Sequence, residues 1–151
     1  MACKRIVQGI LALSIAAIIA LVGMKLSLSP VHADDESAAQ VAMLSDSQGV
    51  NFDEYLRGVY LSVKKSWFQN MPATVSFGNQ GINAVEFRIL QNGSVPQDFV
   101  KIVLKSEKSD LDAASLRAVR TASFSHLPEK YSQPFIVLRF TFYYNSKPPK
   151  Q

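Results

Sequence analysis

The pattern of apolar and polar residues changes period several times along this chain of 151 residues. Between residues 52 and 67, apolar side chains recur three and four positions apart, which predicts one buried face of an amphipathic helix. These side chains are Phe52, Leu56, Val59, Tyr60, Val63 and Trp67. We expect Met71-Pro72 to end the helix. Trp67 lies on the apolar face, so it should anchor a hydrophobic core.

A period of two follows. Residues 82 to 91 place Val85, Phe87 and Ile89 on one face and charged residues on the other, which predicts a half-buried strand. Asn92-Gly93 is a strong signal for a tight type I′ hairpin turn, in which both residues take a positive φ. The return strand is expected between about residues 95 and 104, with Pro96 near its start favouring an edge or a bulge.

The remaining pattern predicts one more helix and one more strand. Ser109 or Asp110 could cap a helix that runs to Ala122, and residues 135 to 144 alternate as a final strand. The predicted fold class is α+β: a small antiparallel sheet of about three strands with two helices packed on one face. An N-terminal hydrophobic helix precedes this domain.

The first 33 residues resemble an export signal. Lys4 and Arg5 precede an apolar run from residue 6 to residue 24, whose 19 residues exceed a typical signal-peptide core and approach the length of a membrane span. The stretch from Pro30 to Ala33 also resembles a signal-peptidase site. Two alternatives stay open: residues 1–33 are an inner-membrane anchor facing the periplasm, or a signal peptide cleaved after Ala33 to release a periplasmic protein.

Composition divides the rest of the chain. Residues 34–51 are acidic and then rich in small and polar residues, which favours a flexible linker. Residues 52–145 form the predicted domain, and residues 146–151 are expected to be a disordered tail. From Asp34 onward 13 basic residues face 12 acidic ones, so no nucleic-acid partner is expected.

Candidate chemistry is sparse. The chain has one cysteine and two histidines, His32 and His126, and lacks the ligand spacing of a zinc site. Asp110 and Asp112 near His126 are better explained by helix capping, and Ser123 and Ser125 beside it lack a nucleophile-elbow motif. We therefore expect no enzyme activity, no catalytic residue, no metal and no cofactor.

The last strand is the strongest candidate for a functional site. Aromatic residues crowd its end, and a sheet-edge position would leave backbone donors and acceptors free for a strand from a partner. The alternative is a central core strand. The candidate partner-binding residues are Phe140, Thr141, Phe142, Tyr143, Tyr144 and Asn145.

The order of these landmarks resembles the C-terminal domain of the TonB/TolA family of bacterial envelope proteins. The similarity extends over residues 52–145 and depends on six dispersed motifs. They are the Trp67-to-Pro72 helix end, the Val85-x-Phe87-x-Ile89 strand, the Asn92-Gly93 turn, the Leu111-Asp112-x-Ala114 helix start, the Phe124-x-x-Leu127-Pro128 corner and the Phe140-x-Phe142-x-Tyr144 strand.

The resemblance implies a non-enzymatic binding protein. Members of this family contact periplasmic or outer-membrane receptors or Tol/Ton-type components, typically by strand pairing, in envelope transport or energy transduction. Here the apolar run lacks a histidine and no proline-rich spacer follows it, so the resemblance implies the binding domain more directly than energy coupling. Residues 6–24 would contact the inner membrane if they are retained, and the chain could also form a homodimer.

Overall fold

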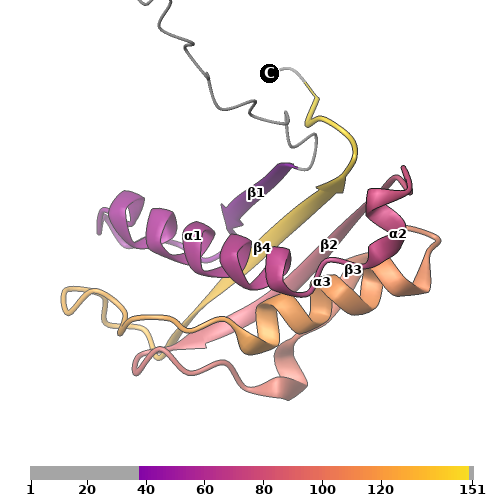
Figure 1. Cartoon of the computed structure of the whole chain (residues 1–151). Helices are drawn as coiled ribbons and strands as arrows, with labels where there is room; N and C mark the ends of the chain where they lie inside the picture. Colours follow the sequence, from indigo (N-terminus) through magenta and orange to yellow (C-terminus); the bar gives the residue numbers. More distant parts are fainter. Residues whose placement is uncertain (1–37, 150–151) are drawn as a thin grey trace, which may run out of the picture. The chain divides into compact units, whose positions relative to one another are not determined.

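A computed structural model describes residues 38–149 of the chain. Within this range the sheet has four antiparallel strands in the order β1-β4-β2-β3 (Figure 1). The elements in chain order are β1 (Ala38–Met43), α1 (Asp53–Gln69), α2 (Ala73–Ser76), β2 (Gly81–Leu90), the 3₁₀ turn η2 (Gln97–Phe99), β3 (Lys101–Leu104), α3 (Ser109–Thr121) and β4 (Phe135–Tyr144).

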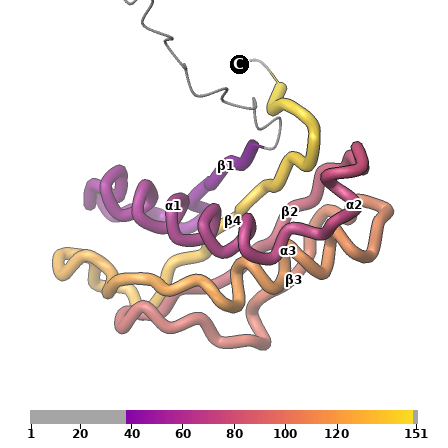
Figure 2. The backbone as a smooth tube through the Cα atoms, in the orientation of Figure 1, coloured from indigo at the N-terminus to yellow at the C-terminus, as the bar shows by residue number. Residues whose placement is uncertain are grey.

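The predicted α+β class is confirmed, and both main helices lie on the same face of the sheet (Figures 1 and 2). Ser62 and Ser66 of α1 face α3: the Ser62 hydroxyl donates to the Ser123 carbonyl, and the hydroxyls of Ser66 and Thr121 are 2.6 Å apart. These small polar residues let the two helices approach closely. Within residues 38–149, no helix covers the opposite face of the sheet.

Alternation along β2 and β4 builds the core beneath the helices. Val85, Phe87 and Ile89 of β2 are at most 1% exposed, as their period predicted. Trp67 is fully buried against β4 and confirms the expected core anchor. A two-layer fold of this kind follows from one apolar face on each element.

The sheet has four strands, so the expectation of about three strands is wrong. The additional strand, β1, comes from the segment predicted to be a linker between residues 34 and 51. It pairs along its whole length with β4, from Ala38 opposite Tyr143 to Met43 opposite Leu138. Alanine is a poor strand former, and the backbone ladder of β4 supplies the order that the local sequence does not.

The connection between β2 and β3 also differs from the predicted type I′ turn. Gly93 has φ +80°, but Asn92 is not among the described residues with positive φ. Instead, the Asn92 side chain accepts a hydrogen bond from the Ser94 backbone N–H, at 3.0 Å. The polypeptide then passes through η2, so that β3 has only four residues and the ladder shifts register between Ala84 and Val85.

The predicted leader, residues 1–33, lies outside the described residues. Within residues 38–149, the structure contains no helix that is long and apolar enough to cross a membrane. Anchor and cleaved signal peptide both stay predictions. Ser146 to Pro149 continue beyond β4, and disorder of the 146–151 tail also stays a prediction.

Candidate partner-binding site

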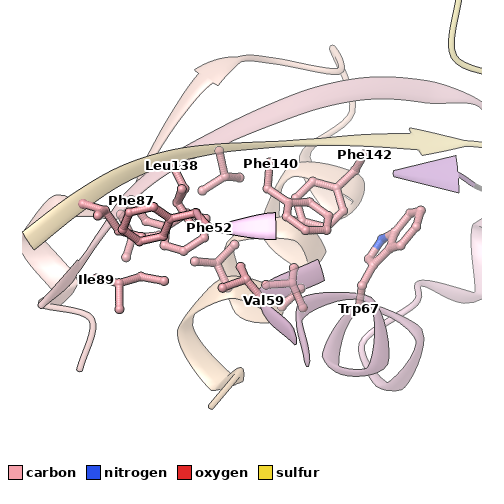
Figure 3. Close-up of a cluster of buried hydrophobic side chains, with 14 of the residues drawn as sticks. Phe52, Val59, Trp67, Phe87, Ile89, Leu138, Phe140 and Phe142 are labelled. Atoms are coloured by element: carbon pink, nitrogen blue, oxygen red, sulfur yellow. The ribbon is translucent and has the colours of Figure 1, made fainter. Parts of the chain in front are cut away.

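The aromatic residues of β4 point in alternate directions. Phe140 and Phe142 are fully buried beneath the helices (Figure 3), and Tyr144 is fully buried as well. The Trp67 ring lies 5.1 Å from that of Phe142 and 5.0 Å from that of Tyr144, both edge-on. These three β4 side chains therefore stabilise the core and cannot contact a partner without unfolding it.

The other candidate residues of this strand have different surroundings. Thr141 and Tyr143 lie on the open face, where Thr141 is half-buried and Tyr143 is 6% exposed. Asn145 has φ +45° and its amide donates to the carbonyls of Val75 and Asn79, at 2.7 and 3.0 Å. Asn145 therefore follows the last residue of β4 and holds α2 and the loop after it against the end of this strand.

Of the two alternative positions left open for this strand, a sheet edge or the centre, the structure shows the central one. β4 pairs with β2 on one side and with β1 on the other. The physical reason is burial: a strand with six buried residues is stabilised by having neighbours on both sides. Partner binding by these residues stays a prediction.

The β1 border of the sheet, which we define as residues 38–43, carries no charge and no proline. Five of its six residues are half-buried and Ala42 is exposed. Along it lies a shallow groove of about 360 Å³, lined in part by Tyr60, Arg139 and Thr141. In the described part of the chain no strand covers its outer edge.

The β3 border, residues 101–104, is built differently. It is short and carries a register shift and Lys101, features that hinder pairing with another strand. Just before it, Phe99 stacks on the Arg88 guanidinium at 3.9 Å, and Arg88 also lies 4.7 Å from the Phe135 ring. These contacts connect the segment before β3 to β2 and β4 on the open face of the sheet.

A buried polar network joins the end of β3 to the core. The Asp112 carboxylate accepts from the backbone N–H and the hydroxyl of Ser106, at 3.0 and 2.7 Å, and from the Asn83 amide, at 2.9 Å. The Ser115 hydroxyl donates to Asn83 and lies 2.7 Å from the Tyr144 hydroxyl. Burial raises the pKa of Tyr144 to about 12, so its hydroxyl keeps the proton that it donates to the Leu111 carbonyl.

Asp110, and Tyr55 beside the segment that contains His126, each have a structural partner. The Thr74 hydroxyl donates to Asp110 and lowers the pKa of that carboxyl. Tyr55 donates to the Ser125 carbonyl at 3.0 Å, and its burial raises its pKa to about 12. His126 borders a groove of about 510 Å³ near the start of α1. Among residues 38–149, no three acidic, histidine or cysteine side chains are placed to hold a metal ion.

Sequence reasoning missed β1, although a weak signal was present. Ala39, Val41 and Met43 alternate with Ala38, Gln40 and Ala42, and the first set packs against the core. Three alanines in six residues hide this period, because alanine is common in helices, loops and linkers alike.

Comparison with known proteins agrees with the fold. Residues 74–145 match the family model for the Gram-negative bacterial TonB protein C-terminal, so the match extends from α2 to the end of β4, and β1 and α1 precede it. No match was found among curated proteins or solved structures. Domains of this family are non-enzymatic and mediate protein interactions in the Gram-negative envelope. The suspected resemblance is confirmed for the matched region: residues 74–145 of this chain belong to the TonB C-terminal family.

Proposed function

We propose that this protein is an envelope adaptor that binds an extended segment of a periplasmic or outer-membrane protein by strand addition. The acceptor is the β1 side of the sheet, where no strand in the described part of the chain covers the outer edge of β1. The observation that carries the proposal is the contrast between the borders: β3 is short, irregular and basic, whereas β1 is regular and uncharged. Strand addition requires a regular, accessible ladder.

The rigidity of β4 supports this role. Its inner side chains interlock with α1, with Phe140 stacked on Tyr60 at 5.9 Å between ring centroids. A strand that adds to the β1 side joins a ladder whose backbone groups are already held in position by β4, so less conformational entropy is lost on binding. The chain thereby needs no cofactor and no reactive side chain to fulfil its function.

The test is site-specific photo-crosslinking of the full chain in the Gram-negative envelope. A photoreactive residue replaces Ala42 or Thr141 on the β1 side, and Val103 on the exposed β3 border serves as the matched control. We expect a discrete adduct with an envelope protein from the first two positions and none from the third. Adducts from Val103 alone, or equal adducts from all three positions, would contradict strand addition at the β1 side.

A second candidate is a cleaved periplasmic binding module without energy coupling. The Pro30-to-Ala33 sequence favours it, whereas the 19-residue apolar run favours an inner-membrane anchor and a role in envelope transport or energy transduction. Envelope fractionation with intact-mass measurement separates the two. A soluble species beginning at Asp34 excludes membrane-coupled transduction by this chain, and an uncut species in the inner membrane supports the tethered adaptor.

A further inference from the structure

We propose that β1 is an exchangeable strand, which occupies the position beside β4 that a partner segment takes when it binds. The partner segment should therefore resemble β1 in sequence. This inference deepens the proposed function and rests on it. The segment is extended and uncharged, about six residues long, and carries a small or aliphatic side chain at every second position, as β1 does.

The hydrogen-bond pattern of β4 shows which backbone groups such an exchange would free. The Leu44 N–H donates to the Val137 carbonyl at 2.8 Å, so Val137 faces β1, and the Gln91 N–H donates to the Pro134 carbonyl at 3.2 Å, so Pro134 faces β2. Partners alternate along an antiparallel strand. Arg139, Thr141 and Tyr143 therefore also direct their backbone groups to β1, and these groups become an open antiparallel acceptor when β1 leaves.

The side chains of β1 are at most half-buried, and those of Ala39, Val41 and Met43 pack against the core. Cross-strand pairs supply much of the stability of a sheet, and β1 places Ala39 opposite Phe142 and Ala42 opposite Arg139. No residue of β1 is buried, whereas six residues of β4 are. The Tyr143 hydroxyl donates to Gln40 at 3.1 Å, a contact that any segment with a side-chain acceptor at that position can replace.

The acceptor does not depend on β1 for its own order. β4 stays paired with β2 over ten residues, from Gly81 opposite Tyr144 to Leu90 opposite Phe135. Its inner aromatic residues remain packed against Tyr60 and Trp67 of α1. The departure of β1 thus breaks one ladder at the border and leaves the core in place.

The competition is between a tethered strand and a free one. A strand joined to its acceptor by a short connection acts at an effective concentration on the order of millimolar. The apparent affinity for a partner segment is reduced by the fraction of molecules in which β1 is displaced. Weakening β1 should therefore tighten partner binding, and locking β1 should abolish it.

A reversible staple tests this in the full chain. The variant carries Cys3→Ser, Gln40→Cys and Thr141→Cys, because Gln40 and Thr141 are paired residues on the open face. The Cα spacing of such hydrogen-bonded antiparallel pairs, about 5.5 Å, suits a disulfide. The probe is a labelled synthetic peptide with the sequence of residues 36–45, and the control peptide carries Gln40→Pro. Cys3→Ser with Thr141→Cys alone is the matched protein control.

We expect the reduced protein to bind the peptide at least tenfold more tightly than the oxidised protein, and the control protein to bind equally in both states. A second full-chain variant, Gln40→Pro, removes a backbone donor to β4 and should bind more tightly than the unsubstituted chain. Since no residue of β1 is fully buried, this variant keeps the core.

The outcomes separate this inference from the proposed function. Equal peptide binding in the oxidised and reduced states overturns exchange but leaves addition to the outer edge of β1. Failure of the folded Gln40→Pro variant to bind the peptide, with crosslinks at Ala42 and Thr141 intact, overturns only the idea that β1 describes the partner. Loss of those crosslinks overturns the proposed function itself.

Discussion

The two borders of the sheet are both short strands without a fully buried residue, yet they are held by different means. At the β3 border, the half-buried carboxylate of Asp112 and the stacked guanidinium of Arg88 attach the flanking segments to the core. At the β1 border, the attachment consists of a regular backbone ladder and of the half-buried side chains of Ala39, Val41 and Met43, which pack against the core. Specific side-chain contacts can be made only by the chain's own residues, so they hold a border strand in place. A backbone ladder, in contrast, can pair with any strand of suitable shape.

Asp112→Ala tests the fastening of the β3 border and should have the largest effect. The change removes the acceptor of two groups of Ser106 and of the buried Asn83 amide. We expect the free energy of unfolding, measured by chemical denaturation, to fall by about 3 kcal/mol, since unpaired buried donors are costly. Asp112→Asn keeps one acceptor oxygen and should lose about half as much. A loss below about 1 kcal/mol for Asp112→Ala would show that the network does not fasten this border.

Hydrogen exchange tests whether β1 opens independently, because successive backbone amides of β4 face β1 and β2 in turn. When β1 opens, the amides of Arg139, Thr141 and Tyr143 lose their acceptors, while those of Phe140 and Phe142 stay bonded to β2. We expect the first set to exchange about a hundredfold faster than the second, because local opening precedes global unfolding.

Residue-resolved NMR exchange provides this measurement, and the oxidised Gln40→Cys/Thr141→Cys staple is its control. The staple should slow the fast set without changing the slow set. Uniform exchange along β4 in the unstapled chain would contradict independent opening of β1.

Arg88→Ala probes the stacking beside β3 and should have a smaller effect. Arg88 lies between the Phe99 and Phe135 rings, so its loss should lower the free energy of unfolding by about 1 kcal/mol. Arg139→Ala is the matched control on the same face, where Arg139 pairs with Glu86 through a bond of 2.9 Å from Nε. That exposed pair should contribute less. Equal losses in thermal or chemical denaturation would show that stacking adds nothing at the β3 border.

The local pattern of apolar and polar residues predicted the elements whose sequences show a clear helical or strand period. The helix that ends near Trp67, the alternating β2 and the strand Phe135–Tyr144 all agree with their periods. Each has large side chains at the buried positions, so burial and periodicity coincide. β3 was predicted too long, because Val95 and Pro96 belong to the connection that leads into η2.

Placement in the sheet could not be predicted in the same way. The sequence of an aromatic strand does not indicate whether the strand lies at a border or in the centre of a sheet. The order β1-β4-β2-β3 depends on pairing between residues about a hundred positions apart. β1 becomes a strand through contact with β4, not through its own propensity. The sequence therefore predicted the strand that carries the candidate residues, but it did not predict the neighbouring strand β1.

The Gln40–Tyr143 contact provides the finest test of how β1 is held. A double-mutant cycle of Gln40→Ala and Tyr143→Phe isolates this hydrogen bond from other effects of either change. We expect a coupling energy of about 0.5 kcal/mol, in the range of a neutral hydrogen bond near solvent. If β1 is exchangeable, the same weakening should raise the affinity of the Gln40→Ala chain for the residue 36–45 peptide about twofold, since 1.4 kcal/mol corresponds to tenfold. A coupling energy above about 2 kcal/mol would mean that a side chain, and not the ladder alone, commits β1 to β4, and would remove the difference between the two borders.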